Sequence, residues 1–387
     1  MVEEPAPRVS HSNSRSRQVP LRELAVFFLR LGTTAFGGPA AHIGIMEDEL
    51  VRRRRWLSRE AFLDLLGASN LIPGPSSSEL AIHIGYLCAG WRGLVIAGSC
   101  FVLPAALMVA ALADLYVRFG KLPAAVGVLY GIKPVVIAII LQALWTLGRT
   151  AVKTTFLGFV GLISLCLTLV STHPLLLLSV AGTIACVPHL RNSRASLFTL
   201  PATPIVGAGL ATTASFSLIS LFLIFLKIGV TVFGSGYVLL AFLRSDLVVH
   251  RGWLTDTQLI DAVAVGQVTP GPVFTTATFI GFILAGVRGA VVSTVAIFLP
   301  AFLLVAVSGP LVPRIRKSNV AGAFLDGVNV ASLALVAAVT WQLGRASLND
   351  GLSVALAALS LIALVRFRVN SAWLVLVGAI VGLVSQS

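Results

Sequence analysis

Two short stretches of this sequence decide its fold, and each contains Pro-Gly-Pro. Residues 70–79 read NLIPGPSSSE and residues 267–276 read QVTPGPVFTT. Proline lacks the N–H that continues a helix but suits a first helical turn, so each stretch is expected to end one helix and begin another. The new helix opens with unpaired N–H groups and the positive end of its dipole. Both stretches therefore predict a helix start that can bind an anion.

The composition around these stretches indicates a polytopic membrane protein. Of the 387 residues, 57% are hydrophobic and only 11% are charged, whereas a soluble domain carries about 25% charged residues. Apolar stretches long enough to span a bilayer recur along the chain. The net charge of +13 falls mostly in short loops, which the positive-inside rule explains better than nucleic-acid binding does.

The chain is also an internal duplication. At an offset of 197 residues, Phe28–Gly32 matches Phe225–Gly229 and the two Pro-Gly-Pro breaks coincide. Beyond the breaks the offset becomes 196, and Leu147–Arg149 matches Leu343–Arg345. We therefore predict four segments: a polar N-terminal tail over 1–20, membrane repeat 1 over 21–190, a linker over 191–215, and membrane repeat 2 over 216–387.

The predicted fold is all-α, with about five transmembrane helices and one re-entrant Pro-Gly-Pro hairpin in each repeat. The arms 61–71 and 76–90 of the first hairpin are too short for a hydrocarbon core of ~30 Å. Such a break is tolerated only where it is buried in protein or lines an aqueous cavity. Five crossings per repeat give the two repeats inverted topology. With residues 52–55 in the cytoplasm, this arrangement places 15 Lys and Arg residues inside and six outside, as the positive-inside rule requires.

Arg30 and Lys227 are matched cations inside apolar segments. A cation at bilayer depth costs free energy unless an opposite charge pairs with it. Here that cost arises at matched positions in both repeats. The alternative is that each long side chain snorkels to an interface. The position of each cation, about ten residues into its stretch, favours function. We predict that the two side chains bind an anion, one from each repeat.

The other predicted substrate contacts surround the two breaks. They are Asn70, Pro73, Gly74, Ser76 and Ser77 in repeat 1 and Gln267, Gly271, Thr275 and Thr276 in repeat 2. Amide and hydroxyl groups can donate to an oxyanion alongside the helix-start N–H groups. The alternative is a structural kink whose hydroxyls bond their own backbone. Discontinuous helices at matched positions are typical of the midplane site of a secondary transporter.

Glu79 and His83 lie one turn apart on one helix face, and repeat 2 has no such pair. They predict either proton coupling, because histidine titrates near physiological pH, or a structural pair that neutralises its own charge. The sequence does not decide between these two roles. His42 is a lesser candidate.

Three further ionisable residues receive weaker assignments. Lys133 is predicted to be a third anion-binding cation or the partner of an acid. Asp64 and Asp261 match across the repeat and are expected to be structural, either capping helices or pairing with loop arginines.

These motifs resemble the chromate ion transporter family in its long, two-domain form. The matches in repeat 1 are FLRLG at 28–32, FGGP at 36–39, HIG at 42–44 and NLIPGP at 70–75, and in repeat 2 GWLT at 252–255 and GQVTPGPV at 266–273. The resemblance covers nearly the whole chain apart from the tail and the linker. It implies oppositely oriented halves and efflux of chromate, a sulfate mimic, which confers chromate resistance on a bacterial cell.

We therefore expect a secondary transporter that exports chromate across the bacterial cytoplasmic (inner) membrane. The alternative is a transporter for uptake or exchange of sulfate or another oxyanion. No nucleotide-binding, HExxH or paired-carboxylate motif is present, so an enzyme, a cofactor and a metal site are not expected. The expected partners are a small oxyanion and the lipid bilayer but no nucleic acid, and a homodimer is left open.

Overall fold

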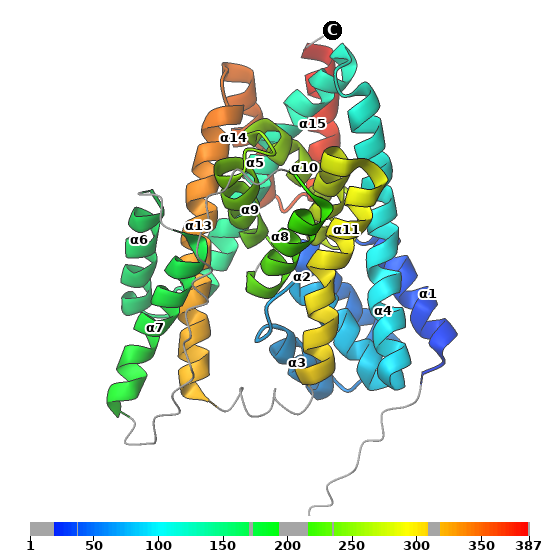
Figure 1. Ribbon diagram of the computed structural model, residues 1–387, viewed down its shortest axis with the longest axis vertical. Coiled ribbons are helices and arrows are strands. Elements are labelled where there is room, and N and C mark those ends of the chain that lie inside the picture. Colours follow the sequence, from blue (N-terminus) through cyan, green and yellow to red (C-terminus); the bar gives the residue numbers. More distant parts are fainter. Residues whose placement is uncertain are drawn as a thin grey trace, which may run out of the picture.

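The computed structural model describes residues 19–36, 38–169, 173–192, 216–233, 236–308 and 318–385. Regular structure in these ranges is helical throughout (Figure 1). The tail predicted over 1–20 and the linker predicted over 191–215 lie almost entirely outside the described residues.

Helices of the two repeats follow the same order. Repeat 1 contains α1 (Leu21–Thr34), α2 (Gly38–Glu47), the π-helix η1 (Asp48–Arg53), α3 (Arg59–Ser69), α4 (Ser76–Phe119), α5 (Pro123–Ala151), α6 (Thr155–Leu169) and α7 (Pro174–Asn192). Repeat 2 contains α8 (Leu218–Thr231), α9 (Val238–Leu243), the π-helix η2 (Arg244–His250), α10 (Asp256–Val268), the 3-10 turn η3 (Val273–Thr275), α11 (Thr276–Ser308), α13 (Asn319–Ser347), α14 (Gly351–Arg366) and α15 (Ser371–Ser385).

Both Pro-Gly-Pro stretches separate two helices, as predicted. α3 ends at Ser69 and α4 begins at Ser76, while α10 ends at Val268 and η3 begins at Val273. The missing proline N–H groups and the positive φ of the central glycine explain why no helix continues through either break. We call residues 73–75 and 270–272 the two hairpin tips.

A second sharp turn follows each tip. Ala89 and Gly90 leave helical geometry inside α4, and Ala285 and Gly286 do the same inside α11. The φ angles are 59° at Gly90 and 58° at Gly286, in the left-handed region that favours glycine. Each turn separates a short arm, which begins at the tip, from a long helix.

The arm and the long helix fold back against each other at matched glycines. A Cβ atom added at Gly85 would clash with the carbonyl of Gly93, and one added at Gly281 would clash with the carbonyl of Gly289. Side chains are therefore excluded where the two backbones meet.

We expect Gly85→Ala and Gly281→Ala each to lower the stability of the protein by about 1–3 kcal/mol, because overpacking against backbone cannot be relieved by a rotamer change. Thermal unfolding of the detergent-solubilised protein measures this loss. Gly148→Ala is the control, since a Cβ atom there meets nothing within 4 Å and alanine favours the helix. Equal melting temperatures for Gly85→Ala and Gly148→Ala would contradict the close approach.

Four helices in the described part of the chain are long and apolar enough to cross a membrane: α4, α5, α11 and α13. The remaining apolar helices at the end of each repeat, α6, α7, α14 and α15, have 15, 19, 16 and 15 residues. A spanning helix needs about 20 residues. By length and composition, two helices of each repeat in the described ranges are full spans, and the others are shorter.

The first segment of repeat 1 doubles back between α1 and the end of η1. Trp56, which follows η1, packs edge-on against Phe27 in the middle of α1 with ring centroids 6.0 Å apart. The guanidinium of Arg54 lies over the same Phe27 ring at 5.4 Å. The segment that begins at α1 therefore folds back on itself, and Trp56, 8% exposed, is packed against α1.

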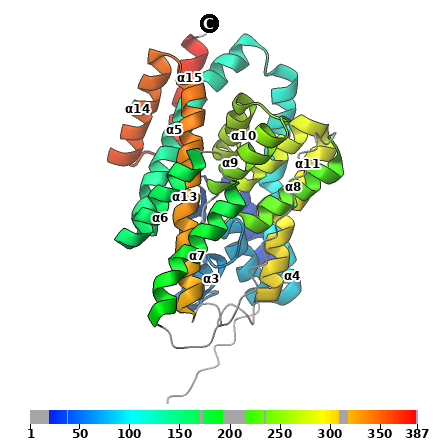
Figure 2. The ribbon, with the colours of Figure 1, turned by 60° about the vertical axis from the view of Figure 1, so that its left-hand side comes forward.

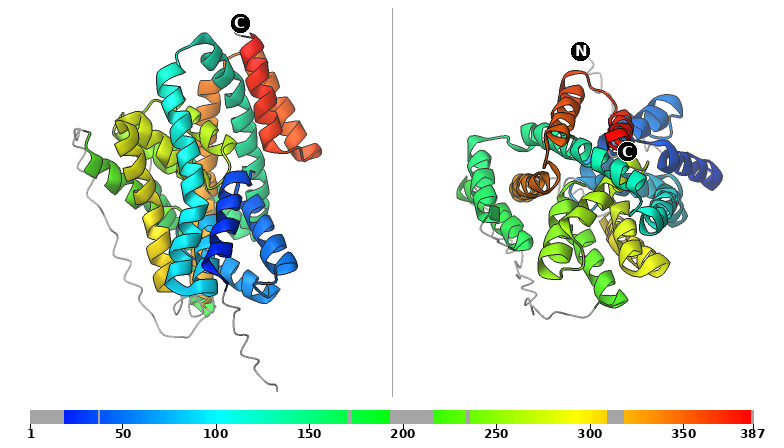
Figure 3. Two further views of the ribbon diagram at one scale, coloured as in Figure 1. Left: turned by 90° about the vertical axis from the view of Figure 1, so that its right-hand side faces the viewer. Right: turned by 90° about the horizontal axis from the view of Figure 1, so that it is seen from above.

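The long helices of the two repeats run in opposite directions. α4 rises and α11 descends in Figure 1, while α5 descends and α13 rises. α1 packs on α4 and α8 packs on α11, and α4 also packs against α11 (Figure 3). The last two helices of each repeat cover the long helix of the other, α14 and α15 on α5, and α6 and α7 on α13 (Figure 2). This interleaving brings both hairpin tips to the middle of the molecule.

Candidate functional site

The two hairpin tips exchange backbone hydrogen bonds with the opposite repeat. The N–H of Gly74 donates to the carbonyl of Val232 at 2.7 Å, and the N–H of Gly271 donates to the carbonyl of Ala35 at 3.1 Å. Ala35 and Val232 end α1 and α8, and they are related by the same offset of 197 residues as the two glycines. Each tip thus meets the end of the first helix in the other repeat. We call this meeting point the tip crossing.

His42 stands at the tip crossing and is fully buried. Its Nε2 lies 3.1 Å from the Ala35 carbonyl, and its Nδ1 lies 3.4 Å from the hydroxyl of Ser77. A neutral ring that donates from Nε2 and accepts from Ser77 satisfies both contacts. The counterpart of His42 in repeat 2 is Leu239, so the duplication gives no symmetric signal for this histidine.

The hydroxyls of repeat 2 are turned toward their own backbone. Thr275 Oγ1 donates to the carbonyl of Pro272 and Thr276 Oγ1 to the carbonyl of Val273, both at 2.8 Å. This is the structural alternative to the predicted anion contact, and it arises because the 3-10 turn brings the carbonyl three residues back within reach. Of the two serines predicted in repeat 1, Ser76 is buried and Ser77 contacts His42.

Glu79 and His83 are buried beside the first tip, with exposed fractions of 0% and 5%. Both carboxylate oxygens of Glu79 and Nε2 of His83 have no hydrogen-bond partner among the described residues. The carboxylate lies against Gly74, where an added Cβ atom would clash with Glu79 Oε1. Because an unsatisfied buried carboxyl is costly, this position demands either a proton or a ligand.

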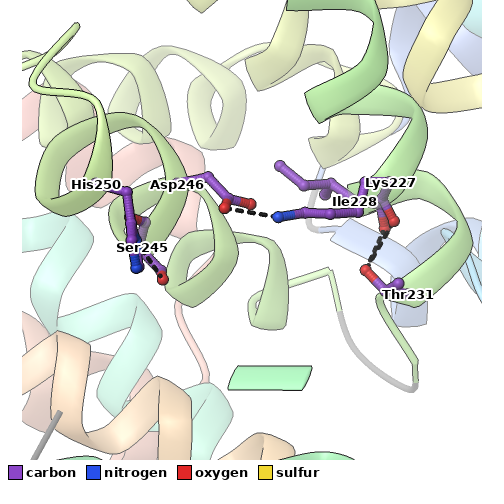
Figure 4. A network of polar contacts seen from close by, with 6 residues as sticks. All are labelled: Lys227, Ile228, Thr231, Ser245, Asp246 and His250. Atoms are coloured by element: carbon purple, nitrogen blue, oxygen red, sulfur yellow. Dashed lines mark hydrogen bonds and ion pairs between the residues drawn. The ribbon is translucent and has the colours of Figure 1, made fainter. Parts of the chain in front are cut away.

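Lys227 forms an ion pair with Asp246, a residue that the sequence did not single out. Its Nζ lies 2.6 Å from Asp246 Oδ1, across the space between α8 and η2 (Figure 4). Thr231, one turn later on α8, donates its hydroxyl to the Lys227 carbonyl at 2.8 Å. The signal that could have revealed Asp246 is its acidic counterpart Glu49 at the same repeat offset.

Repeat 1 places the corresponding groups together but pairs them differently. Glu49 on η1 accepts from Arg53 at 3.0 Å and from Arg54 at 3.2 Å. Arg30 lines a cavity of about 140 Å³ with Glu49 and Arg54, and it forms no ion pair with any described residue. Both acids lie on π-helices, which occur frequently at functional sites. Lys227 therefore contacts the π-helix of its own repeat, Arg30 shares a cavity with its own π-helix, and no cavity described here joins the two cations.

The two break amides line separate cavities. Asn70 lines one of about 230 Å³ together with Phe233 and Val238. Gln267 lines one of about 720 Å³ together with Phe36 and Ala41, the counterparts of that phenylalanine and valine. Each cavity thus lies between the hairpin of one repeat and the first two helices of the other, α8 and α9 in one case and α1 and α2 in the other. The two cavities flank the tip crossing.

Lys133 pairs with an acid, one of its two predicted roles. Its Nζ lies 3.0 Å from Asp261 Oδ1, and Tyr116 donates its hydroxyl to Asp261 Oδ2 at 2.9 Å. The expectation that Asp261 caps a helix or pairs with a loop arginine is wrong, because the interleaved packing brings α5 and α4 of repeat 1 to α10 of repeat 2. Its counterpart Asp64 is exposed. No group of three or more His, Cys, Asp or Glu side chains suited to a metal occurs in the described ranges.

Comparison with known proteins shows which family the chain belongs to. A family model described as "Chromate transporter" matches residues 22–187 and again residues 219–383. The chain is 36% identical over 375 residues to the chromate transport protein of Cupriavidus metallidurans, covering 94% of this chain and 93% of that protein. It is 36% identical over 340 residues to a probable chromate transport protein of Synechococcus elongatus, covering 85% and 86%. Identity to the chromate transport protein of Pseudomonas aeruginosa is 32% over 381 residues, covering 93% and 91%. No solved structure matches the chain.

Proposed function

Because this multi-pass membrane protein belongs to the chromate transporter family, we propose that it is a secondary transporter that exports chromate across the bacterial cytoplasmic membrane and thereby confers chromate resistance. The observation that carries the proposal is the tip crossing, where Gly74 and Gly271 each bind the opposite repeat. Discontinuous helices that meet at the interface of two repeats are typical of the substrate site of a secondary transporter, and the two repeats rock about that site during alternating access.

The proposed topology is inverted, with each hairpin re-entrant. The opposite directions of α4 and α11 support it (Figure 1), as do the reciprocal hydrogen bonds at the tips. In this orientation the arginines at 52–55 face the cytoplasm. Rocking of one repeat against the other would break and remake the tip contacts, exposing one cavity at a time.

Within this mechanism we assign the substrate to the tip crossing and to the cations Arg30 and Lys227, each five residues before the residue that the opposite tip binds, Ala35 or Val232. Arg30, without an acidic partner, supplies a positive charge for a tetrahedral dianion. The amides of Asn70 and Gln267, the serines Ser76 and Ser77 and the helix-start N–H groups complete the donors. Pro73, Gly74, Gly271, Thr275 and Thr276 shape the tips that hold these donors.

Transport of radiolabelled chromate into everted membrane vesicles tests the proposal. We expect uptake above that of vesicles without the protein, competition by sulfate, and chromate resistance in cells that express it. Everted vesicles take up what the cell exports, so uptake only into right-side-out vesicles would overturn export. Growth of a sulfate-uptake mutant on low sulfate would indicate the alternative, a sulfate importer.

We propose that Glu79 and His83 couple this transport to protons, since both are buried beside the first tip without partners. Glu79→Gln keeps the shape of the side chain but cannot release a proton. We expect it to abolish the response of chromate flux to an imposed pH gradient. A flux in Glu79→Gln that still follows the gradient as in the wild type would make the pair structural.

A further inference from the structure

The larger of the two cavities beside the tip crossing has an excess of positive charge. It holds about 720 Å³ and is lined by Arg149, at the end of α5, and Arg368, between α14 and α15. Among the described residues, no aspartate or glutamate lines it. Neither arginine forms an ion pair with any described residue, and the Arg149 guanidinium lies over the Trp145 ring at 5.8 Å, a contact that leaves its charge available.

A buried donor lies at the inner end of the same cavity. Nε2 of Gln267 has no hydrogen-bond partner among the described residues, and Gln267 lies three residues before the second tip. Phe36, the neighbour of Ala35 in the tip crossing, lines the wall. The cavity thus leads from two exposed cations to an unsatisfied amide beside the proposed substrate site.

The smaller cavity, lined by Asn70, lacks this charge. Its one cation, Lys153, binds both carboxylate oxygens of Asp326, at 2.7 and 2.9 Å. Arg345, the repeat counterpart of Arg149, lines neither cavity. The two cavities are lined by matching residues of the hairpins and of the first two helices of each repeat, but they differ in charge. An anion would therefore be attracted into only one of them.

We propose that the larger cavity is a vestibule that binds a tetrahedral oxyanion dianion, recognised by Arg149 and Arg368, before the anion reaches the tip crossing. This inference rests on the proposed function for the ligand class. In the proposed orientation both arginines face the cytoplasm, so the vestibule loads an exporter from the cell interior. Its volume accommodates a hydrated anion, and the amide of Gln267 replaces part of the hydration shell at the inner end.

Binding of chromate to the purified full-length protein in detergent at low salt tests the vestibule directly. Chromate absorbs where tryptophan emits, so it quenches a nearby indole. We expect much of the saturable quenching to be lost in Trp145→Phe and kept in Trp341→Phe, its repeat counterpart outside the cavity. We expect Arg149→Gln and Arg368→Gln each to weaken binding about tenfold, and Arg345→Gln to leave it unchanged. Sulfate should compete, and added salt should weaken binding.

The outcomes separate the vestibule from the transport function. Wild-type chromate affinity in both Arg149→Gln and Arg368→Gln overturns the vestibule, whatever the vesicles transport. Arginine-dependent binding in a protein that carries no chromate into vesicles upholds the vestibule and overturns the proposed function. Both arginines are exposed, so these variants should fold, and an unchanged melting temperature verifies it.

Discussion

Replacing Lys227 with alanine is expected to abolish chromate transport and to destabilise the protein. The change leaves Asp246 with an unpaired charge, and the Asp246 side chain is only 12% exposed. Breaking a fully buried pair costs roughly 3–5 kcal/mol. Because the Lys227 side chain is 35% exposed, we expect a loss of about 1–3 kcal/mol, measured by thermal unfolding in detergent, alongside vesicle uptake.

A double variant separates the two roles of Lys227. Lys227→Ala with Asp246→Asn removes both charges, so stability should return close to that of the wild type. Transport should remain lost if the ammonium binds the oxyanion when Asp246 releases it. Recovery of transport in the double variant would show that Lys227 serves only the ion pair. Asp246→Asn alone is the matched control, and it should keep transport because the cation remains.

Gly271→Ala is expected to reduce chromate transport at least tenfold through the tip crossing. Gly271 has a φ of 96°, and an added Cβ atom would crowd Ala105 and the Gly32 carbonyl. Accommodating the methyl group must move the tip and weaken the bond from its N–H to Ala35. Initial rates of uptake measure the effect, because an alternating-access step depends on making and breaking this contact.

A second glycine controls for backbone strain. Gly252 has a φ of 60° but open space around its Cβ position, and its counterpart Arg55 carries a side chain at a φ of 52°. Gly252→Ala should cost about 1–2 kcal/mol from the left-handed conformation and keep transport. Equal rates of chromate transport by Gly271→Ala and Gly252→Ala would show that the tip crossing has no role in transport.

The positions of the helix breaks were predictable from particular residues. Proline and glycine act on their own backbone, so the breaks at 73–75 and 270–272 and the turn at Gly90 follow from local chemistry. Helix length was less predictable, because the fold-back of the segment that begins at α1 depends on contacts such as Phe27 with Trp56, 29 positions further along the chain.

The candidate site was predictable in its parts but not in its pairing. The duplication singled out Arg30 and Lys227, yet it could not show that Lys227 binds Asp246 while Glu49 binds Arg53 and Arg54. His42 had no symmetric counterpart to mark it. The threonines offered two reasonable orientations for their hydroxyls, and only the 3-10 turn selects between them.

The sequence by itself determined the membrane class, the duplication and the places where Pro-Gly-Pro interrupts the helices, because hydropathy, repeat offset and backbone chemistry are local properties. Only the tertiary structure decided that each tip binds the first helix of the opposite repeat and that one flanking cavity keeps two unpaired arginines. Those features depend on contacts between residues more than one hundred positions apart. Such contacts follow from how α4, α5, α11 and α13 pack together, and they cannot be predicted from the spacing of residues along the chain.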